Sequence, residues 1–463
     1  MYFSTSLMVT SMKTRAILLF FILSPLSGCL QESIEIDTDN DGISDILDED
    51  DDNDGILDSI DHFPLNSSEN HDLDNDGVGD NSDIDIDGDG WENTVENLCG
   101  KDPQDSSSYP LDKDNDSICD FIDPDLEGLL DEIRSFSFKE WQMFSGQDSE
   151  SYALNISTWQ LSDGGWRKNN FEAYKSRWEG VDPFPNTTFA NQQTLADKST
   201  TGDIRFLASQ FLLSSSEENR TIMKNSIDNG IQFILDSQHP SGGWPLVYPF
   251  YECNGCNYSN LMTFNDHVIG SAILLLWDVS EKRWPFFDEV IEGIDLLEVS
   301  QSLNLAIDYV LSSQVIVNGT PTIWGQQHHP FSFESLPARS WEKSCRTPNE
   351  SYFITTILLN WPDRSEEVIN ATWGAVGWYE DNAINNSAFD YGRGEIIESQ
   401  GELLWFRYYN VSDDQYFFAD SNSTKVFNLD ELSIKSRTTY LWAGNWGQRI
   451  IEETSKIPEE SRH

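Results

Sequence analysis

Aspartates at alternate positions recur in the N-terminal part of this 463-residue chain. In three stretches a glycine directly follows the third aspartate, at Gly42, Gly55 and Gly77. Carboxylates at this spacing, followed by a turn, converge their oxygens on one hard cation, as in calcium-binding loops. The sequence therefore predicts four Ca²⁺-binding repeats, with the ligands Asp37, Asp39, Asp41, Asp45, Asp50, Asp52, Asp54, Asp58, Asp72, Asp74, Asp76, Asp80, Asp112, Asp114, Asp116 and Asp120.

A variant copy overlaps this array, because Asp83, Asp85, Asp87 and Asp89 alternate before Gly90. The alternative to an ordered array is a disordered acidic linker, but the regular spacing favours the array. Over about residues 36–124 the pattern resembles thrombospondin type 3 repeats. This resemblance implies a chain that wraps around a row of Ca²⁺ ions with almost no apolar core.

Beyond residue 127 the sequence is rich in aromatic residues and indicates helices. Apolar residues recur at three- and four-residue spacing over residues 204–213, 222–235, 268–279 and 303–311. Three related loops, about 80 residues apart, run from a glutamine through a polar turn with glycine to a tryptophan: Gln160–Trp166, Gln238–Trp244 and Gln314–Trp324. Such a repeat predicts helix pairs arranged in a ring. Residues 403–409 and 415–418 are expected to add short strands.

Seven short motifs in this region occur in the order found in family 10 polysaccharide lyases. They are Gly164-Gly-Trp166-Arg-Lys168, Ile204-Arg-Phe-Leu-Ala208, Gly242-Gly-Trp-Pro245, Thr263-Phe-Asn-Asp266, Trp324-Gly-Gln-Gln-His328, Pro337-Ala-Arg339-Ser-Trp-Glu342 and Arg437-Thr-Thr-Tyr-Leu-Trp442-Ala-Gly444. Over about residues 150–450 the chain thus resembles these pectate lyases. The resemblance implies a mainly α fold, an α/α toroid, and calcium-dependent β-elimination of pectate (polygalacturonate), an acidic polysaccharide.

The implied reaction removes the proton from C5 of a galacturonate, next to a carboxylate, and expels O4. A Ca²⁺ ion between protein and substrate carboxylates takes up the developing negative charge and lets an acidic protein hold a polyanion. The resemblance implies Asp266 and Asp197 as ligands of this catalytic calcium and Arg339 as the base. From the residues alone, Asp266 also suits the N-cap of a following helix, and Arg339 could clamp a carboxylate or pair with Glu342.

Four further residues are candidates for substrate binding. Arg437 matches a late arginine of the family and is expected to bind a substrate carboxylate. Lys168 is either a third cation of the site or a solvated lysine. His328 either donates a hydrogen bond to substrate or is structural, and Trp244 either stacks on a sugar ring or fills the core.

The chain departs from the family pattern at two places. Family members usually have Gln-His-Asp where this chain has Gln327-His328-His329, and Asp-Asn where it has Ala196-Asp197. Either Asp197 replaces the early calcium ligand after a one-residue shift, or the calcium site is weakened.

The N-terminus has the features of a lipoprotein signal. Lys13 and Arg15 precede an apolar run over residues 16–23, and Leu26-Ser-Gly-Cys29 resembles a prokaryotic lipobox. We expect three segments: a signal peptide (1–28), the acidic repeats (29–126) and the lyase-like domain (127–463). Cys29 is expected to carry lipid and to anchor the protein at the outer cell surface; the alternative is an ordinary cleavage site with a coincidental cysteine.

The expected extracellular location guides the prediction of which cysteines form disulfides. Cys99 and Cys119 are expected to form a disulfide. Cys253 and Cys256 have metal-site spacing without a second such pair, which favours a disulfide over zinc, and Cys345 is left as the spare.

The charge restricts the partners. The chain has 80 acidic and 28 basic side chains, a formal net charge of −52, and this field excludes nucleic acid as a partner. We expect a monomer. Two other function classes remain open: an inactive surface lipoprotein that binds acidic glycans, and an inverting glycosidase, which needs two carboxylates ~6.5–9.5 Å apart.

Overall fold

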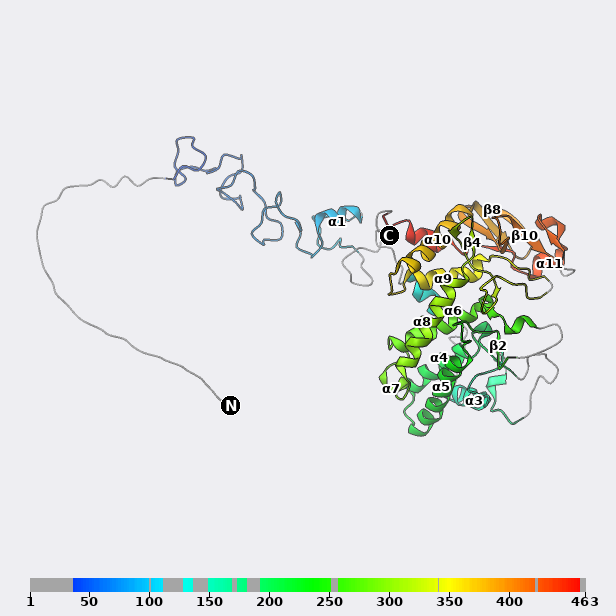
Figure 1. Cartoon of the computed structure of the whole chain (residues 1–463). Helices are drawn as coiled ribbons and strands as arrows, with labels where there is room; N and C mark the ends of the chain where they lie inside the picture. Colours follow the sequence, from blue (N-terminus) through cyan, green and yellow to red (C-terminus); the bar gives the residue numbers. More distant parts are fainter. Residues whose placement is uncertain are drawn as a thin grey trace, which may run out of the picture. The chain divides into compact units, whose positions relative to one another are not determined.

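The chain divides into two compact units, Met1–Pro110 (unit 1) and Leu111–His463 (unit 2) (Figure 1). The computed structural model describes residues 36–99, 101–110, 128–135, 149–168, 173–180, 192–250, 257–339, 341–420 and 424–458. The predicted domain boundary at residue 126, the signal peptide, Cys29, Cys119, Cys253 and Cys256 lie outside these ranges, so those expectations stay predictions. No helix within the described ranges has both the length and the apolar character that a membrane crossing requires.

Unit 1 consists mainly of turns, and its described helix is the short α1 (Asn93–Leu98). Four successive stretches close on themselves through one backbone hydrogen bond each. The amide N–H groups of Asp45, Asp58, Asp80 and Asn93 donate to the carbonyls nine residues earlier, at Ile36, Glu49, His71 and Ile84. The turn glycines Gly42, Gly55, Gly77 and Gly90 have φ values of 94–102°, a left-handed backbone that glycine adopts without strain.

The helices of unit 2 form two rows. One row contains α3 (Ser149–Trp159), α5 (Glu217–Ser237), α8 (Leu296–Ser313) and α10 (Glu366–Asp381); the other contains α4 (Thr201–Leu213), α6 (Val268–Ser280) and α9 (Pro348–Leu359). Helix α4 packs on α3 and α5, α6 packs on α4, α8 and α9, and α9 packs on α10. Shorter helices are α7 (Asp288–Ile291), α11 (Ile434–Thr439) and α12 (Gln448–Thr454), with 3-10 turns η1 (Ala173–Lys175), η2 (Ala196–Lys198), η3 (Asn257–Asn260), η4 (Asn265–His267) and η5 (Leu429–Glu431).

A repeated glutamine ties each helix end to the next helix of its row. The Nε2 of Gln160 donates to Ser226 O of α5 at 2.8 Å, and Gln238 does the same to Ser302 O of α8 at 2.9 Å. Gln314 donates to Ala371 O of α10 at 2.8 Å. Each glutamine also donates to a carbonyl within its own loop, at Gly164, Gly242 or Thr322. The repeated loop motif is thus a structural joint.

Five small antiparallel sheets accompany the helices. Three are two-stranded: β1 (Gln193–Thr194) with β2 (Val247–Tyr248), β3 (Met262–Thr263) with β6 (Gln327–His328), and β4 (Ile316–Val317) with β5 (Thr320–Pro321). Two are three-stranded, with the orders β12-β8-β7 and β11-β10-β9, built from β7 (Ile384–Asp390), β8 (Glu395–Phe406), β9 (Tyr408–Tyr409), β10 (Tyr416–Ala419), β11 (Lys425–Val426) and β12 (Ala443–Gly444).

The expectation of a mainly α fold, an α/α toroid, is wrong. Helices make up 41% of the described residues, and several small sheets stand beside them. The expectation extrapolated three helix–turn–tryptophan units to the whole domain. After α10 the chain instead forms the six strands β7 to β12 within residues 384–444, with η5 and α11 before the last of them; Figure 1 draws this part in orange shades.

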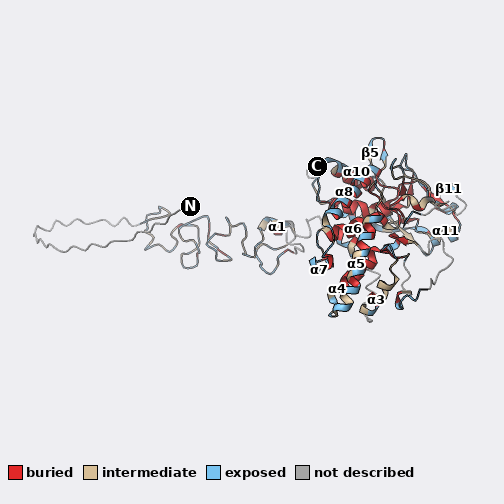
Figure 2. Cartoon of the chain, turned by 60° about the horizontal axis from the view of Figure 1, so that its bottom comes forward, coloured by how far each residue is buried: buried red, intermediate tan, exposed pale blue. Residues whose placement is uncertain are grey.

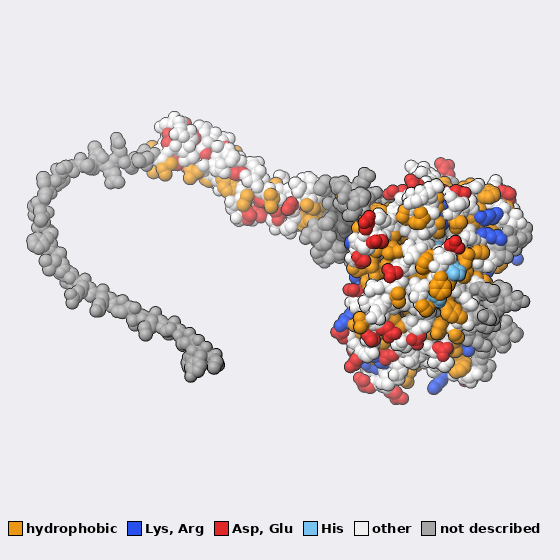
Figure 3. Space-filling model, in the orientation of Figure 1, with side chains coloured by type: hydrophobic (Ala, Val, Ile, Leu, Met, Phe, Trp, Pro, Cys, Tyr) orange, Lys and Arg blue, Asp and Glu red, His pale blue; other side chains and the backbone are white. Residues whose placement is uncertain are grey.

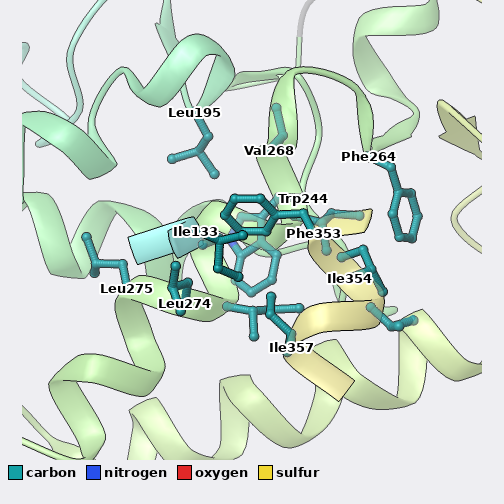
Figure 4. Packing of buried hydrophobic residues seen from close by; sticks show 14 of the residues in the cluster. Ile133, Leu195, Trp244, Phe264, Val268, Leu274, Leu275, Phe353, Ile354 and Ile357 are labelled. Carbon is teal, nitrogen blue, oxygen red and sulfur yellow. The ribbon is translucent and has the colours of Figure 1, made fainter. Parts of the chain in front are cut away.

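The core of unit 2 lies between the helix rows. Every residue of α6 from Val268 to Val279 is buried, and Figure 2 shows buried residues along α6 and its neighbours. Figure 4 shows Trp244, Phe264 and Val268 packed with Phe353 and Ile357 of α9. These residues flank the turn that carries Asp266, so a rigid apolar layer supports that turn.

Candidate active site

Two short ladders each lead into a tight turn that carries an aspartate. Asp197 lies in η2, four residues after Gln193 of β1, and Asp266 lies in η4, four residues after Met262 of β3. Both aspartates have a left-handed backbone, with φ of 50° and 53°. The helices α4 and α6 begin directly after these turns, and η2 and η4 contact each other. The repeated construction therefore brings the two predicted calcium ligands together.

The electrostatics of Asp266 show which charges surround it. Burial raises the pKa of Asp266 to about 6, and the negative charge of Asp197 adds to this. Lys168 and Arg339 act in the opposite direction. Lys168 forms an ion pair with Asp197. Four of the predicted site residues thus share one electrostatic neighbourhood.

Arg339 is held as a cation by its neighbours. Its Nη1 donates to Glu342 Oε1 at 3.1 Å, and its backbone N–H donates to Oε2 of the same carboxylate. Burial alone would lower the pKa of Arg339, but the charge of Glu342 and contacts with Tyr258 raise it above its ordinary value. The sequence predicted the Glu342 pair as one alternative, and the structure contains it.

A buried ionic network beneath this cluster was missed from the sequence. Arg407 Nη2 lies 2.6 Å from Glu350 Oε1, and the Glu350 side chain is fully buried. Gln326 Nε2 donates to Asn265 Oδ1 at 3.0 Å and to Glu350 Oε1 at 3.4 Å. Because Asn265 precedes Asp266, the network braces the turn that carries the carboxylate. Gln326 lies in a motif that the sequence singled out, but nothing nearby marks Arg407.

Two predicted substrate-binding residues are instead structural. Trp244 has no exposed surface, and its indole N–H donates to Ile234 O at 2.8 Å. His328 is also fully buried: its Nε2 accepts from Gly325 N at 2.9 Å, and its Nδ1 lies 2.8 Å from Phe333 O. Burial lowers the pKa of His328 to about 4. Neither side chain can contact a sugar in this structure, because both are buried. The sequence pattern did not reveal that burial.

Arg437 contacts other residues than those around Asp266. It lies in α11, and its Nη1 donates to Asp430 Oδ1 at 2.7 Å. Gly394, in the turn between β7 and β8, approaches the backbone and Cβ of Arg437 so closely that a side chain at 394 would collide with it. The structure therefore places Arg437 beside this hairpin turn.

In unit 1, carboxylate oxygens converge at four places. Each group offers three oxygens within 4.8 Å of one another: Asp37/Asp39/Asp41, Asp50/Asp52/Asp54, Asp72/Asp74/Asp76 and Asp85/Asp87/Asp89. Three of the predicted repeats and the variant copy are thus assembled in the described chain. The predicted repeat Asp112/Asp114/Asp116/Asp120 lies outside the described residues.

The fourth aspartate of each repeat does not join these groups of three. Asp45, Asp58 and Asp80 accept hydrogen bonds from backbone N–H groups seven residues earlier, at Thr38, Asp51 and Leu73. In the variant copy Asn93 does the same for Ile86 N, at 3.0 Å. In this structure the fourth residue of each repeat therefore accepts a backbone hydrogen bond instead of joining the predicted ligand group. Asparagine can accept this bond as well as aspartate can.

An acidic residue eleven positions after the first aspartate of each group of three was not predicted as the closing ligand of its loop. The pattern Asp-x-Asp-x-Asp-Gly-x5-Asp/Glu of calcium loops carries this signal, and the residues are Asp48, Asp61, Asp83 and Glu96. Glu96 is fully buried, and neither of its carboxylate oxygens has a partner among the described residues. Burial, together with the charges of Asp87 and Asp89, raises its pKa to about 7.

The donor set of these loops fits a hard divalent cation. Oxygens of Asp85, Asp87 and Asp89 are buried without a hydrogen-bond partner in the described chain, as is one oxygen of Asp52, a residue only 8% exposed. Buried carboxylate oxygens of one charge repel each other unless a cation neutralises them. Oxygen ligands in this number suit Ca²⁺. Cys99, at the end of α1, is disulfide-bonded, and its predicted partner Cys119 lies outside the described residues.

A family model described as pectic acid lyase matches residues 160–451. A mutant family 10 polysaccharide lyase from Cellvibrio cellulosa, solved with trigalacturonic acid, is 25% identical, with a TM-score of 0.60 over 67% of this chain and 94% of its own. Another structure of a family 10 polysaccharide lyase from that organism is 24% identical, with a TM-score of 0.59 over 67% of this chain and 93% of its own. No curated protein matches the chain.

Proposed function

Because the chain belongs to the pectic acid lyase family and is a polysaccharide lyase, we propose that it cleaves pectate by calcium-dependent β-elimination. The observation that carries this proposal is the juxtaposition of Asp197 and Asp266 in adjacent turns, with Lys168 and Arg339 within electrostatic reach. Two carboxylates that influence each other electrostatically, next to two cations, suit a site for a metal ion and an anionic sugar. The related lyase bound to trigalacturonic acid supports a uronate as the substrate.

Asp266 and Asp197 are the residues that would hold the catalytic Ca²⁺. Two protein carboxylates leave most of its coordination sites for substrate carboxylate and water, since Ca²⁺ takes six to eight ligands. When bound, the ion would supply positive charge that stabilises negative charge developing beside C5. The elevated pKa of Asp266 fits this role, because a carboxylate that is costly to ionise alone gains most from a cation.

The remaining steps fall to the chain's own residues. In the elimination the C5–H and C4–O4 bonds break, a C4–C5 double bond forms, and the leaving O4 takes up a proton. We assign Arg339 as the base that accepts the C5 proton. Its ion pair with Glu342 must first loosen, so that the guanidinium can release a proton to solvent and become a neutral base. Lys168 contributes positive charge for a substrate carboxylate. The Glu350–Arg407 network positions the Asp266 turn through Gln326 and Asn265.

The decisive experiment measures unsaturated product from polygalacturonate and trigalacturonate, with added Ca²⁺ or with chelator. We expect absorbance from the new double bond in Ca²⁺ and none in chelator. Asp266→Ala should lower kcat/KM by at least about 100-fold at limiting Ca²⁺, and excess Ca²⁺ should restore part of it. Saturated reducing ends would instead indicate a glycosidase, and polymer binding without cleavage would indicate a glycan-binding protein.

Unit 1 we propose to be an array of Ca²⁺ sites resembling thrombospondin type 3 repeats. The support is the four groups of converging carboxylates and the buried, unpartnered oxygens of Asp52 and Glu96. Such sites would stiffen a segment whose large apolar side chains, such as Ile46, Leu47 and Ile60, are exposed and not packed in a core.

Cys29 we propose to be the lipid-bearing N-terminus of the mature protein, which would place the enzyme at the outer cell surface. The support is the Leu26-Ser-Gly-Cys29 sequence behind a basic and apolar leader. Intact mass of the membrane fraction should show a chain that starts at Cys29 with added acyl mass. Unchanged membrane association of a Cys29→Ser protein would contradict this assignment.

A further inference from the structure

An exposed cluster of two phenyl rings and two imidazoles lies outside the cluster around Asp266. The ring centroids of His239 and Phe331 are 5.1 Å apart, and those of His239 and Phe250 are 6.0 Å apart. His329 lies 6.2 Å from Phe331, measured between ring centroids. Phe331 is 68% exposed and Phe250 is 47% exposed. Figure 3 shows histidine among hydrophobic side chains on this face of unit 2.

The backbone fixes both imidazoles in one orientation. Ser241 N donates to His239 Nδ1 at 3.1 Å, and Phe331 N and Ser332 N donate to His329 Nδ1 at 3.2 and 3.0 Å. A ring nitrogen that accepts a backbone N–H is unprotonated, so the proton of each neutral ring is on Nε2. Burial, reinforced by the neighbouring His329, lowers the pKa of His239, which keeps its ring neutral. Neither Nε2 has a hydrogen-bond partner among the described residues.

The cluster lies at the same end of the helices as the candidate active site. Its residues belong to the connection from α5 to α6 and to the connection from α8 to α9. Asp266 is in the first of these connections, and Asp197 is in the equivalent connection from α3 to α4. The three connections lie side by side, because β1 of the first pairs with β2 of the second, and β3 of the second pairs with β6 of the third.

The strand pairing in two short ladders shows where the aromatic cluster lies relative to Asp197 and Asp266. Met262 of β3 pairs with His328 of β6, and Gln193 of β1 pairs with Tyr248 of β2. The aspartates follow four residues after Met262 and Gln193, whereas Phe331 and Phe250 follow His328 and Tyr248 on the antiparallel partners. The aromatic cluster is therefore at the opposite end of both ladders from the carboxylates. The cluster is therefore separated from the two carboxylates along the direction of the ladders.

We infer that His239, Phe250, His329 and Phe331 form a distal subsite for a further sugar unit of an acidic polysaccharide chain. Exposed aromatic rings offer apolar faces to the C–H side of a sugar, and the two Nε2–H groups offer donors to its hydroxyl and carboxylate oxygens. This inference rests on the proposed function, since it assumes that a uronate chain occupies the Asp197–Asp266 cluster.

The test compares a long substrate with a short one. We expect Phe331→Ala to lower the ratio of kcat/KM for polygalacturonate to that for trigalacturonate by about three- to tenfold, mainly through KM of the polymer. Phe331→Tyr, which keeps the ring, should retain the wild-type ratio. Phe287→Ala is the matched control, because Phe287 is a similarly exposed phenylalanine (46%) beside α7.

A second variant tests the donors. In His329→Asn the side-chain amide oxygen can still accept the two backbone N–H groups, but the Nε2–H donor of the imidazole is lost. The polymer-to-trimer ratio should fall again. If the wild type cleaves both substrates and neither Phe331→Ala nor His329→Asn changes the ratio, the subsite is wrong and the proposed function stands. If the wild type cleaves neither substrate, the proposed function fails and the subsite falls with it.

Discussion

Arg339 faces two opposing requirements. A guanidinium that binds a uronate should keep its charge, whereas a base must lose its proton first, and free arginine holds that proton strongly. Glu342 favours the charged form, since its carboxylate contacts both the side chain and the backbone N–H of Arg339. The same side chain can therefore be tested for either role by changing its partner.

We predict that Glu342→Gln shifts the pH–rate profile towards lower pH. Removing the negative charge lowers the pKa of Arg339, so more of the neutral base is present at a given pH. The amide oxygen of glutamine can still accept the backbone N–H, so the turn is preserved. The measurement is kcat/KM for polygalacturonate between pH 7 and about 11 in saturating Ca²⁺. If Arg339 acts only as a cationic clamp, the rising limb should keep its position.

The residues of the site differ in how far their sequence predicts them. Asp266 lies in a family motif and Asp197 one residue away from the family position, so their pairing in one site was predicted from the family resemblance. Glu350 and Arg407 are 57 positions apart, and only the folded chain brings them together. Trp244 and His328 lie in recognisable motifs, but a motif does not reveal whether a side chain faces the core or the solvent.

At the scale of the elements, the glutamine joints hold neighbouring helices of one row together. Gln314 is the most buried of the three, and its Nε2 satisfies the carbonyls of Thr322 and Ala371. Since the side chain connects a loop to the next helix, its loss affects two elements at once.

We predict that Gln314→Ala lowers the free energy of unfolding of unit 2 by about 1–3 kcal/mol, the cost of leaving buried polar groups without partners. Gln232→Ala is the control, because Gln232 is an exposed residue of α5 whose side chain bonds only to Asp236 in the same helix. Urea unfolding followed by tryptophan fluorescence measures both variants. Equal midpoints for the two variants would show that the joint does not contribute to stability.

Secondary structure was predicted well where periodicity is strong. Helices α4, α5, α6 and α8 lie where apolar spacing placed them, and strands occur within the expected residues 403–409 and 415–418. Strand β7, with the sequence Ile-Asn-Asn-Ser-Ala-Phe-Asp, has little apolar alternation and is stabilised by pairing with β8. Pairing between segments is not visible in either segment alone, and this is why the fold class was mistaken.

At the scale of the whole molecule, negative charge is concentrated in one segment. Residues 30–127 contain 34 acidic side chains and two lysines. Even when salt at about 0.1 M screens them, these charges repel each other over distances of about 10 Å, and the described part of the segment buries little apolar surface to oppose that repulsion. Cations must therefore determine how compact it is.

We predict that Ca²⁺ compacts unit 1 and protects it from proteases, and that chelation expands it. Asp52→Asn should create a new cleavage site within residues 50–61 in millimolar Ca²⁺, because Asp52 is a buried member of its carboxylate group. Glu49→Gln makes the same charge change at an exposed position and serves as the control. Small-angle X-ray scattering with and without Ca²⁺ measures the change in the radius of gyration. Identical scattering profiles would favour a disordered linker.

The backbone bonds that close each repeat of unit 1 join residues only nine positions apart. Loops of about ten residues close within roughly 100 ns, and contacts so local require little of the rest of the chain. A repeat stretched open by a pulling force can therefore re-form by itself once the load is released. Under tension, such a segment would lengthen one repeat at a time.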